Sequence, residues 1–162
     1  MKGAGAAAGA VFLLWIAAIL NLSVATRLSV LGGTPDFPLV VLACLSLRFS
    51  RRGSTVLGFG SGLVTGVLAG ANMTIYVASR CVTGFLLGWF NSMDFEATAL
   101  MAAVLAFGSS IVAQLLVLFL GAYHGPLPRY LGGTISTAVY NAVIAVPVYA
   151  LLRKIAATSR AG

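Results

Sequence analysis

Residues 54–90 read STVLGFGSGLVTGVLAGANMTIYVASRCVTGFLLGWF, and this stretch decides the fold. It contains two apolar runs, 54–70 and 73–90, with only Ala71 and Asn72 between them. Each run has about the length that an α-helix needs to cross the hydrocarbon core of a bilayer. Because so short a connection joins antiparallel neighbours, we predict a transmembrane helical hairpin.

The rest of the chain is also strongly apolar. Of its 162 residues, 60% are hydrophobic and 8% are charged, and the mean hydropathy is +1.03. Soluble domains carry about 25% charged residues, which cover their surfaces. The composition therefore predicts an integral membrane protein, in which residues 1–162 form one transmembrane domain with short loops.

Four further apolar runs flank the hairpin. We predict an all-α, polytopic bundle of six transmembrane helices, with approximate spans at residues 6–22, 37–50, 54–70, 73–90, 97–122 and 131–152. The second span is short, so it either tilts or relies on terminal arginines that reach the headgroups. The first follows Lys2 and also resembles a signal peptide, so its cleavage is the less favoured alternative.

Positive charge is unevenly divided between the two sides of these six spans. One side carries Arg27 and Arg129, and the other carries Lys2, Arg48, Arg51, Arg52, Arg153, Lys154 and Arg160. Lys and Arg concentrate in cytoplasmic loops, so we predict that both termini are cytoplasmic. Orientation, rather than binding to nucleic acid, then explains the net charge of +7. The inner-face basic residues are expected to attract anionic lipids; they are Arg48, Arg51, Arg52, Arg153 and Lys154.

Glycine recurs at every fourth position of the third span. Residues four apart share one face of a helix, and a glycine-lined face lets another helix approach closely in lipid. The occupant of this groove is either a neighbouring helix of the same bundle or a partner protein's transmembrane helix. The predicted groove residues are Gly58, Gly62, Gly66 and Gly70.

Polar residues inside the predicted spans are the other candidates. Arg80 lies about 12 Å along its helix from Asn72, and an ionisable residue at that depth is costly. It either reaches the headgroups or bundle carbonyls, or contacts an acidic or phosphate group on a partner or ligand. Asn141 is expected to form a hydrogen bond between helices, and Pro147 to bend the last helix.

Catalytic and metal chemistry has few candidates in this chain. The acidic residues are Asp36, Asp94 and Glu96, and His124 is the only histidine. Cys44 and Cys81 lie in apolar runs without metal-ligand spacing, which is typical of buried thiols. We therefore expect a scaffold or binding subunit that is not an enzyme and holds no cofactor or metal.

Residues 34–90 resemble the central signature of the bacterial rod shape-determining MreD family. The matching positions are Pro35 and Asp36 at the start of the second span, and Gly58, Phe59, Gly62 and Leu63 in the third. Residues 140–154, YNAVIAVPVYALLRK, are similar to the family's last helix, with Asn141 and Pro147 at its polar and proline positions. Two positions depart from the family. Gly66 replaces a usual aspartate, and Arg80 replaces an apolar or small residue.

The resemblance implies a non-catalytic scaffold subunit of the cell-elongation complex, which synthesises peptidoglycan at the bacterial inner membrane. The implied partners are the bitopic protein MreC, the actin-like MreB, and the glycosyltransferase RodA with its transpeptidase. The family also looks like the substrate-binding subunits of energy-coupling-factor vitamin transporters, which are the alternative function. Such a subunit would dock its coupling protein through Ala6, Ala10 and Ala17. Its vitamin site would draw on Tyr76, Tyr123 and His124.

Overall fold

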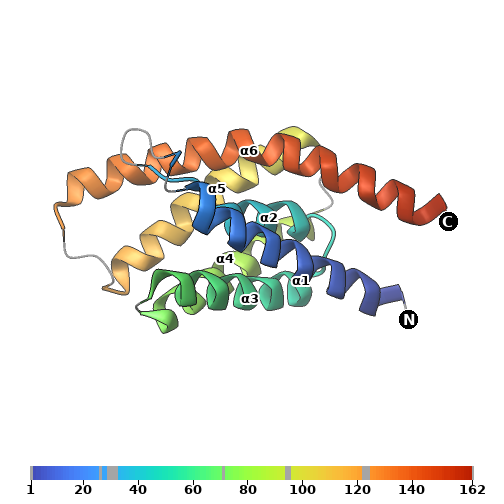
Figure 1. The fold of residues 1–162 in the computed structure, drawn as a ribbon, viewed down its shortest axis with the longest axis horizontal. Helices are drawn as coiled ribbons and strands as arrows, with labels where there is room; N and C mark the ends of the chain where they lie inside the picture. Colours follow the sequence, from blue (N-terminus) through green and yellow to red (C-terminus); the bar gives the residue numbers. More distant parts are fainter. Residues whose placement is uncertain are drawn as a thin grey trace.

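The computed structural model describes residues 2–25, 27–28, 33–70, 72–93, 96–121 and 125–161, excluding the side chains of 2–4, 6–7 and 156–161. Within these ranges the chain is helical and carries no strand. The elements are α1 (Lys2–Leu20), the π-helix η1 (Asn21–Ala25), α2 (Phe37–Ser46), α3 (Arg51–Ala69), α4 (Met73–Asn91), α5 (Ala99–Phe119) and α6 (Leu127–Ala161). They form one elongated bundle (Figure 1).

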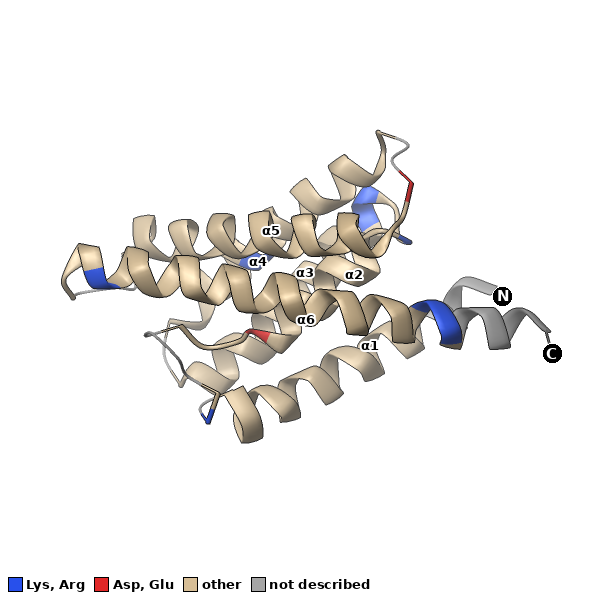
Figure 2. Cartoon of the chain, turned by 90° about the horizontal axis from the view of Figure 1, so that it is seen from above, with Lys and Arg blue, Asp and Glu red and all other residues tan. Residues whose placement is uncertain are grey.

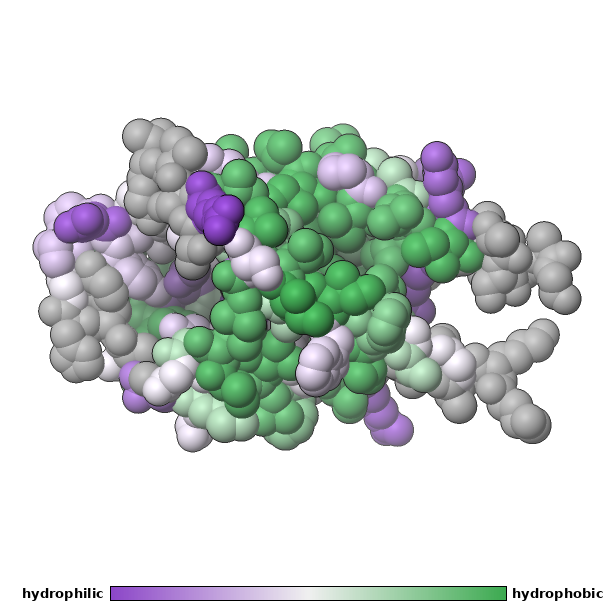
Figure 3. Space-filling view, in the orientation of Figure 1, coloured by the Kyte–Doolittle hydropathy of each residue, from purple (hydrophilic) through white to green (hydrophobic). Residues whose placement is uncertain are grey.

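The surface of the bundle suits a bilayer. Four helical segments are long enough and apolar enough to cross a membrane: Ala8–Ala25, Met73–Asn91, Ala99–Phe119 and Leu127–Ile155. Apolar residues cover the middle of the face in Figure 3, and hydrophilic residues lie towards its two ends. The predicted class, an all-helical membrane bundle, is confirmed at this level.

The second predicted span begins where predicted, at Phe37, but its helix is shorter than 37–50. α2 has 10 residues, so it is about 15 Å long, half the thickness of the hydrocarbon core. Every residue from Pro38 to Ser46 is buried, because α2 contacts α1, α3, α4, α5 and α6. Residues 37–50 are therefore not a tilted span. They contain a half-length helix enclosed by protein, followed by a turn that ends at Ser50.

The other helices pack around α2 in pairs. α3 and α4 form the predicted hairpin, α5 and α6 form a second close pair, and α1 lies across α2 and α3 (Figure 1). α3 has the length of a span, but its glycines, hydroxyl residues and two terminal arginines make it less apolar than the other four. The core is centred on α2, with Leu39, Val40 and Leu42 almost fully buried.

The last helix is longer than its predicted span of 131–152. α6 begins at Leu127 because Pro128 falls in its first turn, where the missing amide N–H has no helical partner to lose. It continues through Pro147 to Ala161. Since Pro147 has no N–H, the carbonyl of Val143 lacks its usual helical donor.

Both ends of the described chain lie at the same end of the bundle. α1 begins there and α6 ends there, as Figure 1 shows. Most Lys and Arg segments gather towards the two ends of the bundle in Figure 2. The basic end is defined by the exposed residues Arg48, Arg51, Arg52, Arg153 and Lys154.

Candidate functional site

The glycine stripe of α3 faces α4. A Cβ atom added at Gly58 would lie 2.3 Å from the carbonyl oxygen of Arg80, and one at Gly62 would lie 2.6 Å from the Cα of Val77. At Gly66 the nearest atom would be the Cα of Met73, at 2.9 Å. Side chains do not tolerate such distances to backbone, so these glycines allow the two helices to touch.

α4 contributes glycines of its own to the same interface. A Cβ at Gly84 would lie 2.4 Å from the carbonyl oxygen of Ser54, and one at Gly88 would lie 2.7 Å from the Cα of Arg51. Because α4 fills the stripe, the alternative of a partner's helix against Gly58, Gly62 and Gly66 is wrong. Gly70 does not belong to the stripe. It ends α3 in the left-handed conformation, with φ +66, which glycine adopts at little cost.

An extended segment leads the chain to the start of α2. A Cβ at Gly33 would lie 2.5 Å from the Cβ of Ser136, so this segment lies directly against α6. The backbone N–H of Thr34 donates to the Thr137 hydroxyl at 3.1 Å. Pro35 is fully buried. These contacts bring Asp36 into the interior of the bundle.

Asp36 has two roles at this point. Its Oδ1 accepts a hydrogen bond from the Leu39 N–H at 3.1 Å and so caps α2. Its Oδ2 forms an ion pair with Nη2 of Arg80 on α4. The Arg80 side chain is only 4% exposed and that of Asp36 14%. The intramembrane contact predicted for Arg80 is therefore an internal carboxylate, and the arginine does not extend to the headgroups.

Asn141, on α6, is hydrogen-bonded both to α5 and to the start of α2. Its Oδ1 accepts from the backbone N–H of Asp36 at 2.9 Å, and its Nδ2 donates to the Ser110 hydroxyl at 2.8 Å. The predicted hydrogen bonding between helices is confirmed. The Phe37 N–H donates to Oδ1 of Asn21 at 3.1 Å. The first turn of α2 is thus bonded to η1, α4 and α6, which satisfies donors that a buried helix end would otherwise leave unpaired.

A cavity adjoins this cluster in the half of the bundle away from the basic end. We call it the polar cavity; its volume is about 300 Å³. Its polar lining consists of Asn21, Thr34, Asp36, Thr65, Tyr76, Arg80 and Gln114. A second cavity of about 270 Å³ shares Thr34 and Gln114 with it and includes Arg129. Sequence reasoning missed these cavities because their walls come from six separate segments.

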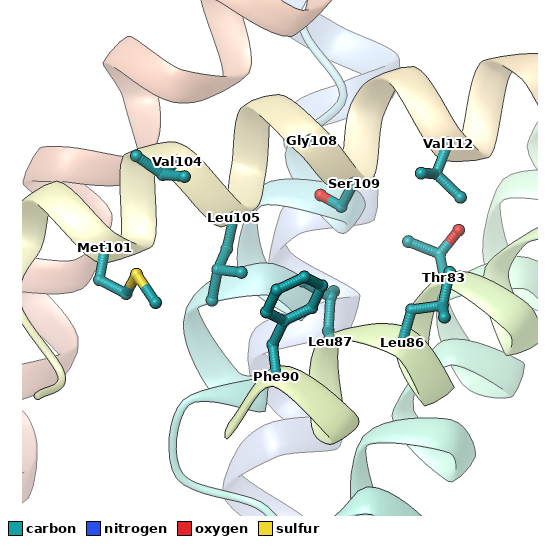
Figure 4. A pocket seen from close by; sticks show the side chains of 10 residues that line it. All are labelled: Thr83, Leu86, Leu87, Phe90, Met101, Val104, Leu105, Gly108, Ser109 and Val112. Atoms are coloured by element: carbon teal, nitrogen blue, oxygen red, sulfur yellow. The ribbon is translucent and has the colours of Figure 1, made fainter. Parts of the chain in front are cut away.

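A second feature is an apolar groove between α4 and α5, which we call the α4–α5 groove. Its volume is about 340 Å³. Figure 4 shows side chains of the two helices facing each other across it, with the Phe90 ring between the helices. Gly108 also lines the groove, and a Cβ added there would meet nothing within 4 Å. No sequence signal separates this groove from an ordinary lipid-facing surface.

The remaining predicted residues are scattered. Phe59 is exposed, Leu63 lines an apolar groove between α1 and α3, and Pro147 is exposed on α6. Ala10 and Ala17 are each 2% exposed, so they offer no free docking face to a coupling protein. Tyr76 lines the polar cavity. Six positions named from the sequence lie outside the described side chains: Lys2, Ala6, Asp94, Tyr123, His124 and Arg160.

In the described part of the chain, no group of three or more His, Cys, Asp or Glu residues is placed to hold a metal ion. No protein-family model, curated protein or solved structure matches the chain.

Proposed function

We propose that this protein is a non-catalytic scaffold subunit of the bacterial cell-elongation complex and that it acts in the inner membrane. The resemblance of residues 34–90 and 140–154 to the MreD family supports this assignment. The structural observation that carries it is the α4–α5 groove, an open apolar surface on a bundle whose glycine stripe is already filled. The scaffold works by holding a partner's transmembrane helix in this groove.

The groove exists because α4 and α5 belong to different pairs. α4 packs closely on α3 and α5 on α6, while α4 and α5 make fewer contacts with each other. From Thr83 to Phe90 the groove follows α4 for about 10 Å, or two helical turns. That length suits a short row of side chains on a crossing helix. In lipid, such contacts stabilise association through van der Waals packing.

The occupant that we assign to the groove is the single transmembrane helix of a bitopic partner, MreC in the family that the chain resembles. A protein with a single transmembrane helix has no other helix of its own to pack against. All side chains of that helix that face lipid are therefore available to fill an apolar groove. RodA with its transpeptidase would join through that partner. At the basic end, Arg48, Arg51 and Arg52 suit anionic lipids and a cytoplasmic MreB filament.

The experiment is co-purification of the tagged full-length chain from native membranes in mild detergent. Gly108→Leu places a side chain in the groove from a position where a Cβ meets nothing within 4 Å, and Gly132→Leu is its matched control, since a Cβ there also meets nothing within 4 Å. We expect the wild type and Gly132→Leu to recover an MreC-type protein with the wall-synthesis proteins. Gly108→Leu should lose them while its melting temperature stays unchanged.

Two outcomes would contradict the proposal. If Gly108→Leu retains its partners at the wild-type level, the groove does not hold the partner helix. Recovery of paired ATPases with a coupling subunit would instead identify a substrate-binding subunit of an energy-coupling-factor transporter.

A further inference from the structure

We propose that the polar cavity binds a small organic anion through a carboxylate or phosphate oxygen, with Arg80 as the hydrogen-bond donor at its inner wall. This site has no lining residue in common with the α4–α5 groove, and it goes beyond the scaffold function, since neither depends on the other. Three features support it: the guanidinium of Arg80, the charges around the cavity, and the size and lining of the cavity.

Arg80 is bonded on one side only. Its Nη2 contacts Asp36, whereas its Nη1 is buried and has no hydrogen-bond partner among the described residues. A guanidinium presents five N–H donors in a rigid fork, and leaving a buried charged donor unbonded is costly. Arg80 also lines the polar cavity. An oxyanion bound there would give the guanidinium its second partner, because guanidinium groups bind carboxylates and phosphates with two parallel hydrogen bonds.

The surrounding charge favours an anion. Asp36 neutralises Arg80, and the adjoining cavity adds Arg129, so the two cavities together have two guanidinium groups and one carboxylate in their walls. The formal charge is therefore +1 before a ligand enters. A monoanion would bring it to zero, whereas a cation would add to the positive charge.

Hydroxyl and amide groups complete the lining. Thr65 and Tyr76 contribute hydroxyls. Gln114 stands where the two cavities meet, and its Oε1 accepts a hydrogen bond from the Tyr130 hydroxyl at 2.9 Å. A volume of about 300 Å³ is at the lower end of the range for small-molecule sites. The cavity thus suits a compact molecule, with its oxyanion at Arg80 and its polar remainder towards Gln114.

The same oxyanion chemistry has two sources, a free small molecule and the phosphate of a membrane lipid. The test measures the melting temperature of the full-length chain by tryptophan fluorescence in discs of phosphatidylcholine. Sodium phosphate and sodium acetate are the soluble probes, and sodium chloride at equal ionic strength is the reference. A second series replaces part of the lipid with phosphatidylglycerol and adds no soluble probe.

Three variants accompany the wild type. Arg80→Lys keeps a positive charge beside Asp36 but replaces the fork with a single ammonium group. Arg52→Lys makes the same exchange at the exposed basic end, so it is the matched control. Arg129→Gln removes the charge from the adjoining cavity and spares the buried ion pair, so it still tests the proposal if Arg80→Lys does not fold.

We expect a rise of about 3–6 °C at ten times the dissociation constant, growing with the logarithm of the anion concentration, in the wild type and in Arg52→Lys. The apparent affinity should fall at least tenfold in Arg80→Lys and measurably in Arg129→Gln. A rise with phosphate or acetate identifies a free anion, and a rise only with phosphatidylglycerol identifies a lipid headgroup. No rise in either series, or equal rises in all variants, would overturn the proposal and leave a cavity that holds water only.

Discussion

Asp36 and Arg80, 44 residues apart in the chain, form an ion pair inside the bundle where the first turn of α2 meets the middle of α4. Each side chain makes the burial of the other tolerable, since an unpaired charge in a membrane interior is costly. Because Asp36 also caps α2, the pair links the position of the short helix to that of α4. Arg80, a charged residue within an apolar run, is thus part of the core.

Removing one partner of this pair should destabilise the bundle strongly. We expect Arg80→Leu to lower the free energy of unfolding by about 3–5 kcal/mol, because it leaves the Asp36 carboxylate buried and unpaired. The double variant Asp36→Asn/Arg80→Leu should recover part of this loss, since Asn can still cap the helix. Unfolding of the purified chain in mixed micelles measures both values. Asp36→Asn alone completes the comparison. If the losses of the two single variants add up to the loss of the double variant, the two residues are not coupled.

Two glycines of α3 allow the effect of an added methyl group on stability to be compared within one helix. Gly62→Ala should destabilise the chain by about 1–3 kcal/mol, because the new methyl group would overlap the Cα of Val77 and force α3 from α4. Gly60→Ala is the control. Its Cβ would meet only the Leu14 side chain, at 3.9 Å, and alanine favours helix by about 1 kcal/mol over glycine. Equal melting temperatures for the two variants would disprove the close α3–α4 contact.

Asn141 should contribute more to the stability of the bundle than the size of its side chain suggests. Asn141→Leu removes both hydrogen bonds, leaving the Asp36 N–H and the Ser110 hydroxyl without this partner, which we expect to cost about 1–3 kcal/mol. Ser136→Ala on the same helix is the control, because its hydroxyl donates to the carbonyl of Gly132 one turn earlier and bonds to no other helix among the described residues. If the two substitutions lower the unfolding free energy equally, the link between helices contributes nothing of its own.

Labelling from outside the cell tests the orientation. Met93 and Leu127 are exposed, at 48% and 51%, and they follow α4 and begin α6 at opposite ends of the bundle. With Cys44 and Cys81 replaced by alanine, we expect a membrane-impermeant maleimide to label Leu127→Cys in intact cells. Met93→Cys should react only after the cells are lysed. The reverse pattern would place the basic end outside the cytoplasm.

The sequence predicted what depends on local pattern. The α3–α4 hairpin follows from two apolar runs and a short linker, and the bonding of Asn141 follows from the cost of an amide in an apolar helix. It did not predict that α2 is enclosed, because a short apolar run looks the same whether protein or lipid surrounds it. The pairing of Asp36 with Arg80 was missed for a related reason. It depends on how the helices pack together, which the spacing of residues along the chain does not reveal.

The enclosure of α2 has a consequence for how the chain is assembled in the membrane. A helix of 10 residues is too short to be retained by the translocon as a span of its own. Its first turn is bonded to Asn141, which is synthesised 105 residues after Asp36. α2 therefore reaches its final place only after α6 has been inserted. We therefore expect the bundle to close when α2 is seated, and a chain truncated before α6 to leave α2 accessible to protease.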